Sequence, residues 1–173
     1  MNYRLLIVLL LFGFTAQADE AGPGVHVDLD QVVEAGKVEP VDGITSAGQP
    51  DEAALKVFAE SGYSVVIDMR GPNEDRGVEN FEEVVEATGM TYVAFPVSSQ
   101  DEISFDTAKS LDALLQDAEG PVLIHCGSGN RVGAVLALRE SLAGADDETA
   151  LQYGRDAGMT RLEPAVRAVL ESD

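Results

Sequence analysis

Cysteine is nearly absent from this chain, and basic residues are scarce. Its 173 residues include one cysteine, and 31 acidic residues outnumber 11 lysines and arginines, giving a formal net charge of −20. A single thiol cannot form a disulfide within the chain, which leaves a reactive site or a buried thiol as its role. The excess negative charge argues against binding nucleic acid or anionic membranes, because both repel an acidic surface. Any site for an anionic ligand must therefore be a local island of positive charge.

The first 18 residues have the pattern of a secretory signal peptide. Arg4 supplies a positive charge, residues 5–14 form a hydrophobic stretch too short to span a bilayer comfortably, and Ala16–Ala18 matches a small-x-small cleavage site. We expect residues 1–18 to be removed and the mature protein to be exported, either to a bacterial periplasm or out of the cell. No membrane insertion is expected after leader removal. The alternative interpretation of this segment is an N-terminal core helix.

The rest of the chain divides into an extension and one domain. Residues 19–40 are acidic and contain several glycines, as in a linker or a short amphipathic segment. His26 lies in this extension without a partner in the sequence pattern, and we expect it to be solvated. Over residues 41–173, apolar segments typical of buried strands alternate with amphipathic segments. This alternation predicts an α/β domain with a mostly parallel sheet and helices on its faces.

The predicted elements can be placed along the chain. After a first segment at residues 44–49, strands are expected at residues 64–69, 91–97 and 122–125. Helices are expected over residues 51–61, 77–88, 104–118, 131–143, 146–157 and 162–171. Ligands of such sheets bind at the carboxyl ends of the strands, which directs attention to the loop after residue 125.

That loop contains the single cysteine. Cys126 follows an apolar strand and opens a loop, residues 127–130, that ends on Arg131 where a helix begins. A helix N-terminus and a nearby guanidinium both stabilise the thiolate, the reactive form of cysteine. Glycines in the loop let successive amides point at an anion, and Arg131 offers a planar fork of donors to phosphate or sulfate-like groups. The segment therefore predicts a site that binds an oxyanion and attacks it.

The neighbouring residues receive supporting roles. Ser128 and Asn130 supply side-chain hydrogen bonds that fix the loop or orient Cys126. His125, the last strand residue, is expected to pack beneath the loop and bond to its backbone instead of acting as a general base. A buried core cysteine is the alternative for Cys126, but a core strand needs no glycine-rich loop after it.

Four segments occur in the order found in a known family. They are Ile44–Pro50, Val66–Arg70, Gly89–Val97 and His125–Gly133. Together they resemble the beta-lactamase-hydrolase-like phosphatase domain, a bacterial branch similar to protein tyrosine and dual-specificity phosphatases. The resemblance covers about residues 41–145 of the chain. It implies a three-layer phosphatase-like α/β fold whose mostly parallel sheet has about four to five strands flanked by helices.

The resemblance also implies an activity. It is hydrolysis of phosphate esters through a phosphocysteine intermediate, with no metal or other cofactor, on a phosphorylated small molecule or a phosphoprotein. Cys126 would be the nucleophile, and Arg131 would stabilise the transition state. The phosphate would be bound by Gly127, Ser128, Gly129, Asn130 and Arg131. Related phosphatases place an aspartate on the loop after the strand that matches residues 91–97. By offset that position is Ser99, and Asp101, two residues beyond, is the candidate general acid, with Glu102 and Asp106 as reserves. A solvated loop carboxylate is the alternative for Asp101.

The sequence departs from the phosphatase pattern at the loop. Four residues separate Cys126 from Arg131, where phosphatases have five. Four is the spacing of rhodanese-like sulfurtransferases, whose Ser-Gly-Asn-Arg loops resemble residues 128–131. Val132 stands where phosphatases have a serine or threonine that assists breakdown of the phosphocysteine, which predicts slow turnover.

Two alternatives to a phosphatase therefore stay open. Rhodaneses share the Ile67–Arg70 segment and Glu74, but this chain lacks their Gly-His-Ile segment. A rhodanese-like sulfurtransferase or a catalytically weak anion-binding module would also use the Cys126 loop. Arg70 is expected to form a structural salt bridge with Glu74 or to support the site.

Overall fold

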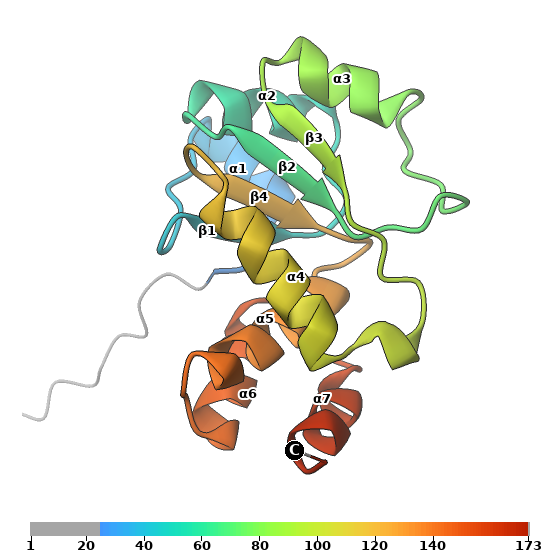
Figure 1. The fold of residues 1–173 in the computed structure, drawn as a ribbon. Helices are drawn as coiled ribbons and strands as arrows, with labels where there is room; N and C mark the ends of the chain where they lie inside the picture. Colours follow the sequence, from blue (N-terminus) through green and yellow to red (C-terminus); the bar gives the residue numbers. More distant parts are fainter. Residues whose placement is uncertain (1–24, 173) are drawn as a thin grey trace, which may run out of the picture.

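The fold is a parallel sheet between two layers of helices (Figure 1). A computed structural model describes residues 25–172, so the predicted signal peptide lies outside the described residues. The strands are β1 (Ile44–Ala47), β2 (Val65–Asp68), β3 (Thr91–Ala94) and β4 (Val122–His125). They lie in the order β1-β4-β2-β3, and every neighbouring pair is parallel. The predicted fold class is confirmed.

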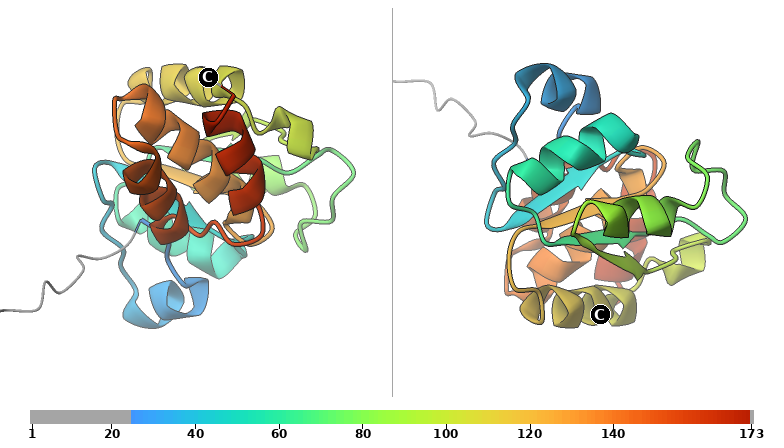
Figure 2. Two further views of the ribbon diagram at one scale, coloured as in Figure 1. Left: turned by 90° about the horizontal axis from the view of Figure 1, so that it is seen from below. Right: turned by 90° about the horizontal axis from the view of Figure 1, so that it is seen from above.

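Helices cover both faces of the sheet. The helices α1 (Leu29–Ala35), α2 (Glu52–Glu60) and α3 (Phe81–Ala87) share a buried core with one face. The opposite face packs against α4 (Phe105–Gln116), α5 (Asn130–Leu142), α6 (Asp147–Asp156) and α7 (Glu163–Leu170). Seen from below, α5, α6 and α7 lie together beneath the sheet (Figure 2). Strands buried on both faces explain the nearly continuous apolar runs of β2 and β4.

Local sequence sets the helix boundaries. Asp51, Ser104 and Asp146 each cap a helix by accepting a hydrogen bond from a backbone N–H in its first turn, at 2.8–3.2 Å. Gly129 has a φ of 81° and immediately precedes α5, so the loop after β4 enters the helix through a left-handed turn. All six predicted helices are present. Five are shorter than predicted because their ends are caps and turns, whereas α5 has the predicted length and is shifted by one residue toward the N-terminus.

Strand register places the candidate site. Ala47, Asp68 and Ala94 share one row across the sheet with His125, the last residue of β4. The residues just beyond this row therefore meet at the carboxyl edge of the sheet, and Cys126 is among them.

The segment before β1 differs from its sequence expectation. Residues 25–27 lie beside β1, with an isolated parallel bridge between His26 and Ser46, and α1 follows. Val25 and Val32 are buried. The expectation that His26 is solvated is wrong: its ring is partly buried and its Nδ1 lies 3.2 Å from Ser46 Oγ. No helix within residues 25–172 is long and apolar enough to cross a membrane.

Candidate active site

Cys126 lies at the bottom of the predicted loop. It directly follows β4, its amide donates to the Ala47 carbonyl at 3.4 Å, and only 1% of its surface is exposed. Gly127 and Ser128 are exposed, while Gly129 and Asn130 are buried at the start of α5. A Cβ on Gly127 would lie 3.8 Å from Arg131 Nη2, so the guanidinium folds back along the loop. The predicted order of strand, thiol, loop and arginine is confirmed.

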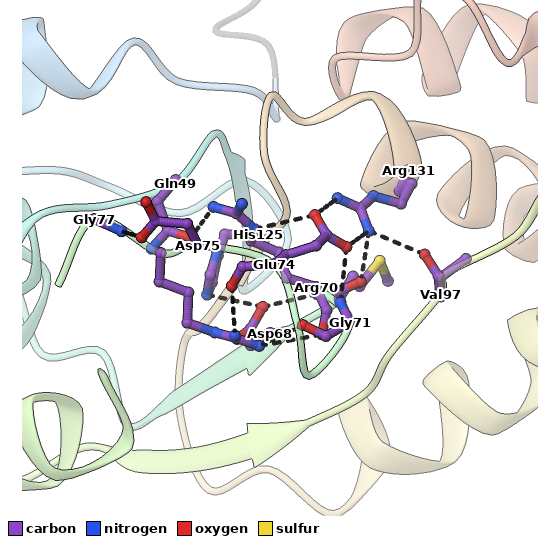
Figure 3. A network of polar contacts seen from close by, with 12 residues as sticks. Gln49, Asp68, Arg70, Gly71, Glu74, Asp75, Gly77, Val97, His125 and Arg131 are labelled. Atoms are coloured by element: carbon purple, nitrogen blue, oxygen red, sulfur yellow. Dashed lines mark hydrogen bonds and ion pairs between the residues drawn. The ribbon is translucent and has the colours of Figure 1, made fainter. Parts of the chain in front are cut away.

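The Arg131 guanidinium is fixed along one edge. Its Nη1 donates to Glu74 Oε1 at 2.6 Å and to the carbonyls of Val97 at 3.0 Å and Met69 at 3.2 Å. Its Nη2 donates to Glu74 Oε2 at 2.7 Å (Figure 3). Among the described residues, Nε and the second Nη2 hydrogen have no oxygen acceptor. A guanidinium has five N–H donors in a rigid fork, so these two are left for the Cys126 side chain, which also raises the pKa of Arg131, and for a ligand.

Glu74 is the residue that orients Arg131. Besides both Arg131 nitrogens, its carboxylate accepts from Arg70 Nε at 3.2 Å and from the Gly71 amide at 2.8 Å. The hydrogen bond from Arg131 is the main reason that the pKa of Glu74 is lowered to about 2, with smaller contributions from the Gly71 amide and Arg70. The same hydrogen bond raises the pKa of Arg131, and the charge of Cys126 adds to it.

The expected Arg70–Glu74 salt bridge is therefore confirmed, and it belongs to a larger hydrogen-bond network in which Glu74 also binds Arg131. The sequence showed only the four-residue spacing of Arg70 and Glu74, and it gave no signal for the contact between Glu74 and Arg131. These two residues are 57 positions apart in the chain, so only the fold brings them together.

A second carboxylate, Asp68, ends β2 beneath the loop. It is fully buried and accepts from the Arg70 amide at 2.8 Å, Arg76 Nε at 2.6 Å and the Tyr92 hydroxyl at 3.0 Å. Arg70, Arg76 and Arg131 thus converge on Asp68 and Glu74, three positive charges against two negative ones. This excess of one is the local positive island that an anion site in so acidic a chain requires.

His125 packs under the loop, as predicted. It is fully buried, its ring centroid lies 5.1 Å from that of Phe81, and its Nε2 is 3.6 Å from Asp68 Oδ1. Neither ring nitrogen makes a hydrogen bond of good geometry within residues 25–172, but the backbone of Cys126, the first residue after β4, lies near enough to the ring to favour its protonated form. Burial lowers the pKa of His125 to about 4, although the Asp68 charge opposes this.

This burial predicts a pH dependence of stability. His125 stays neutral in the folded protein down to about pH 4, whereas the unfolded chain takes up the proton near pH 6.5. Neutral His125 therefore contributes fully to the free energy of unfolding above pH 6.5. This contribution, about 3 kcal/mol, is lost as the pH falls from 6.5 to 4. Urea unfolding at a series of pH values measures it. In His125→Asn the free energy of unfolding should depend less on pH between pH 4 and 6.5. An unchanged dependence would contradict its assignment to His125.

Asn130 fixes the loop from outside. Its Oδ1 accepts from the Thr160 amide at 2.7 Å, the Thr160 hydroxyl at 3.1 Å and the Leu162 amide at 3.3 Å. Ser128 adds a backbone bridge to Gly48. The predicted structural role of the Asn130 side chain is confirmed. Val132, in contrast, is fully buried in the core, so the residue after the arginine contributes packing and no hydroxyl.

The candidate acids follow β3 on the segment that begins at Val97, whose carbonyl accepts from Arg131. Asp101 belongs to the 3₁₀ helix η1 (Gln100–Glu102), is exposed, and lines a groove with Phe105 of α4 and Val169 of α7. Within residues 25–172 it has no hydrogen bond or ion pair to the Cys126 loop. Glu102 accepts from the amide of Ser99 at 2.9 Å and serves as a cap, and Asp106 lies 3.6 Å from Lys109 Nζ.

Glu74→Gln tests the orientation of Arg131. Glutamine can accept at only one of its two atoms, so the paired contact with Arg131 is lost and kcat/KM for a phosphate ester should fall about 10- to 100-fold. Asp75→Asn is the matched control, because Asp75 carries the same charge on the same loop and bonds only to the Gly77 amide. Equal losses in the two variants would show that charge alone, and not orientation, is involved.

Solved structures of other proteins share this fold. A protein of Neisseria meningitidis described as a candidate phosphatase has the same fold, with a TM-score of 0.63, 23% identity and coverage of 74% of this chain and 92% of that one. P. aeruginosa TpbA, solved in complex with pTyr, has a TM-score of 0.51 and 18% identity, over 72% of this chain and 82% of that one.

Sequence comparisons identify the family. The beta-lactamase hydrolase-like protein of Agrobacterium fabrum is 33% identical over 104 residues, which are 58% of this chain and 24% of that protein. The chain thus matches about a quarter of this relative's length. The family described as "Beta-lactamase hydrolase-like protein, phosphatase-like domain" matches residues 40–143. Because this match spans more than half of the sequence, the chain belongs to that phosphatase-like family.

Proposed function

We propose that this protein is a cysteine-dependent phosphatase that hydrolyses phosphate esters through a phosphocysteine intermediate. The observation that favours it is the Arg131 guanidinium. Glu74 and two carbonyls occupy one edge of the fork, and the remaining Nε and Nη2 donors are left for the equatorial oxygens of a phosphoryl group above Cys126.

The reaction has two steps. The Cys126 thiolate forms a bond to phosphorus, the ester P–O bond breaks, and the departing oxygen takes a proton from a general acid. Water then attacks the phosphocysteine, the P–S bond breaks, and inorganic phosphate leaves with the thiolate restored. Arg131 and the loop amides hold the same oxygens in both steps. Phosphocysteine chemistry requires no metal, so activity is expected to persist in a chelator.

A sulfurtransferase is the second candidate, and the four-residue spacing between Cys126 and Arg131 favours it. Its thiolate would attack the outer sulfur of thiosulfate, and the S–S bond would break to release sulfite and leave a persulfide. Cyanide would then take the outer sulfur as thiocyanate and restore the thiolate. The same pair of donors on Arg131 would then bind the sulfonate oxygens.

One set of assays separates these functions. The purified protein is supplied with p-nitrophenyl phosphate plus chelator, with and without vanadate, and separately with thiosulfate and cyanide. Vanadate-sensitive phosphate release supports the phosphatase. Thiocyanate production without phosphate release would overturn it in favour of sulfur transfer. Phosphate binding without either turnover would indicate an anion-binding module.

Asp101 is proposed as the general acid, from its place after β3. Asp101→Asn should lower kcat about 10²-fold for phenyl phosphate, whose leaving oxygen needs a proton, and far less for p-nitrophenyl phosphate. Asp117→Asn, at an exposed position after α4, is the matched control. Equal effects on both substrates would exclude Asp101 as the acid.

The substrate is proposed to be a phosphorylated small molecule or phosphoprotein met outside the cytoplasm. This rests on the leader pattern of residues 1–18. N-terminal sequencing of the protein from a periplasmic fraction should begin at Asp19, and an intact Met1 in the cytoplasmic fraction would contradict export.

A further inference from the structure

The chain before β1 reaches the back of the Cys126 loop. The Val27 amide donates to the Ser46 carbonyl at 3.0 Å, and the Ser46 amide donates to the Val25 carbonyl at 2.9 Å. Residues 25–27 thereby extend the sheet beyond β1, on the side where α1 lies (Figure 2). The His26 amide also donates to the Asp156 carbonyl of α6 at 3.0 Å. His26 is thus anchored by its backbone from two sides.

The His26 ring fills a slot between two glycines. A Cβ on Gly129 would lie 2.6 Å from His26 Nδ1 and closer still to Cε1, and a Cβ on Gly158 would lie 2.7 Å from Nδ1. Both glycines have left-handed backbone angles, with φ of 81° and 97°. Glycine at these positions therefore gives both the turn and the room for the ring. Gly129 is the residue from which α5 and Arg131 start.

A hydrogen-bond chain fixes the ring and its proton. The Ser46 hydroxyl donates to the Ala157 carbonyl at 2.7 Å, so toward His26 its oxygen must accept. His26 Nδ1 therefore carries a hydrogen and donates it over 3.2 Å. Burial lowers the pKa of His26, and the nearby Asp28 opposes this only in part.

We propose that His26 is a positioning residue for the Cys126 loop, whose ring holds the Gly129 turn in place from behind. The amides at the start of α5 stabilise a thiolate only while this turn keeps them aimed at Cys126. His26 and Gly158 both lie outside residues 40–143, the part matched by the phosphatase-like family. Segments on both sides of the matched region in the sequence thus pack against the Cys126 loop and support it.

Asparagine separates the two contacts of the ring. Its Cγ and Nδ2 reproduce Cγ and Nδ1 of histidine, which face Gly158 and Ser46, but it lacks the Cε1 that lies closest to Gly129. His26→Asn should therefore keep the Ser46 hydrogen bond and weaken the support of the Gly129 turn, because two of the three ring atoms near Gly129, Cε1 and Nε2, are removed. His26→Ala removes both contacts. Gln31→Ala, at an exposed position on α1, is the control for changes in this segment.

Alkylation of Cys126 by iodoacetamide is the measurement. Because the chain has one cysteine, the reaction reports on this thiol alone. We expect His26→Asn to melt close to the wild-type temperature, yet to be alkylated about 3- to 10-fold more slowly at neutral pH. Gln31→Ala should match the wild type, and all variants should react equally in denaturant.

Two results would overturn the proposal. One is wild-type alkylation of His26→Asn at every pH. The other is that His26→Ala is alkylated more slowly only to the extent that its melting temperature falls, while His26→Asn keeps both the wild-type alkylation rate and the wild-type melting temperature. The inference uses the reactive thiolate of the proposed phosphatase. Its test needs no phosphate release, so absence of phosphatase activity and failure of the positioning role are distinguishable.

Discussion

Cys126→Ser is expected to lower kcat/KM for p-nitrophenyl phosphate by at least about 10³-fold, because a serine hydroxyl in this loop lacks a base to activate it. His125, the adjacent titratable group, is buried and points to Asp68, so it offers no general base. The substitution changes one buried atom, and the melting temperature should stay near that of the wild type. Steady-state kinetics and thermal unfolding check the two halves of this prediction.

Binding distinguishes loss of the nucleophile from loss of the site. Phosphate or vanadate binding to the Cys126→Ser variant, measured by calorimetry, should persist because Arg131 and the loop amides remain. Residual turnover within about 10-fold of the wild type would contradict a phosphocysteine mechanism, since the nucleophile would then lie elsewhere.

Arg131→Lys should lower kcat/KM about 10²- to 10³-fold, with weaker vanadate inhibition. A lysine ammonium retains the charge but cannot contact both Glu74 oxygens and a phosphoryl group at once. Stopped assays with saturating substrate separate the effect on kcat from that on KM.

Arg139→Lys is the matched control for Arg131→Lys. Arg139 lies on the same helix, is paired with Asp112 at 2.8 Å, and faces away from the loop toward α4. Similar losses in both variants would mean that Arg131 acts by stabilising α5. Combining Arg131→Lys with Glu74→Gln should cost less than the sum of the single effects, because each change already breaks the same contact.

The arrangement of carboxylates explains how an acidic protein can bind an anion. Most of its negative charge lies on the surface, whereas Asp68 and Glu74 are each bonded to arginines at the edge of the sheet. The site keeps a positive excess of one because its carboxylates are fewer than its arginines. Salt screens the distant surface charges more than this compact cluster, so substrate association is expected to improve as ionic strength rises.

Much of the fold was readable from the chain. The runs at residues 64–69 and 122–125 are apolar enough to require burial on both faces, and the helices between them have caps and glycine stops. α1 and η1 were not predicted as elements, because each is short and its stability depends on packing against the domain. The burial of His26 is not predictable for a related reason. The glycines that its ring packs against, Gly129 and Gly158, are more than 100 positions away along the chain.

The parts of the Cys126 loop can be recognised from the sequence alone. One thiol, a glycine-rich turn and an arginine at a helix start are local features, since residues within six positions of each other must lie close in space. The contacts that hold this loop in place become visible only in the folded chain. Glu74 behind Arg131, Thr160 on Asn130 and His26 behind Gly129 all come from distant segments. Such contacts depend on strand order and register, which no local pattern specifies.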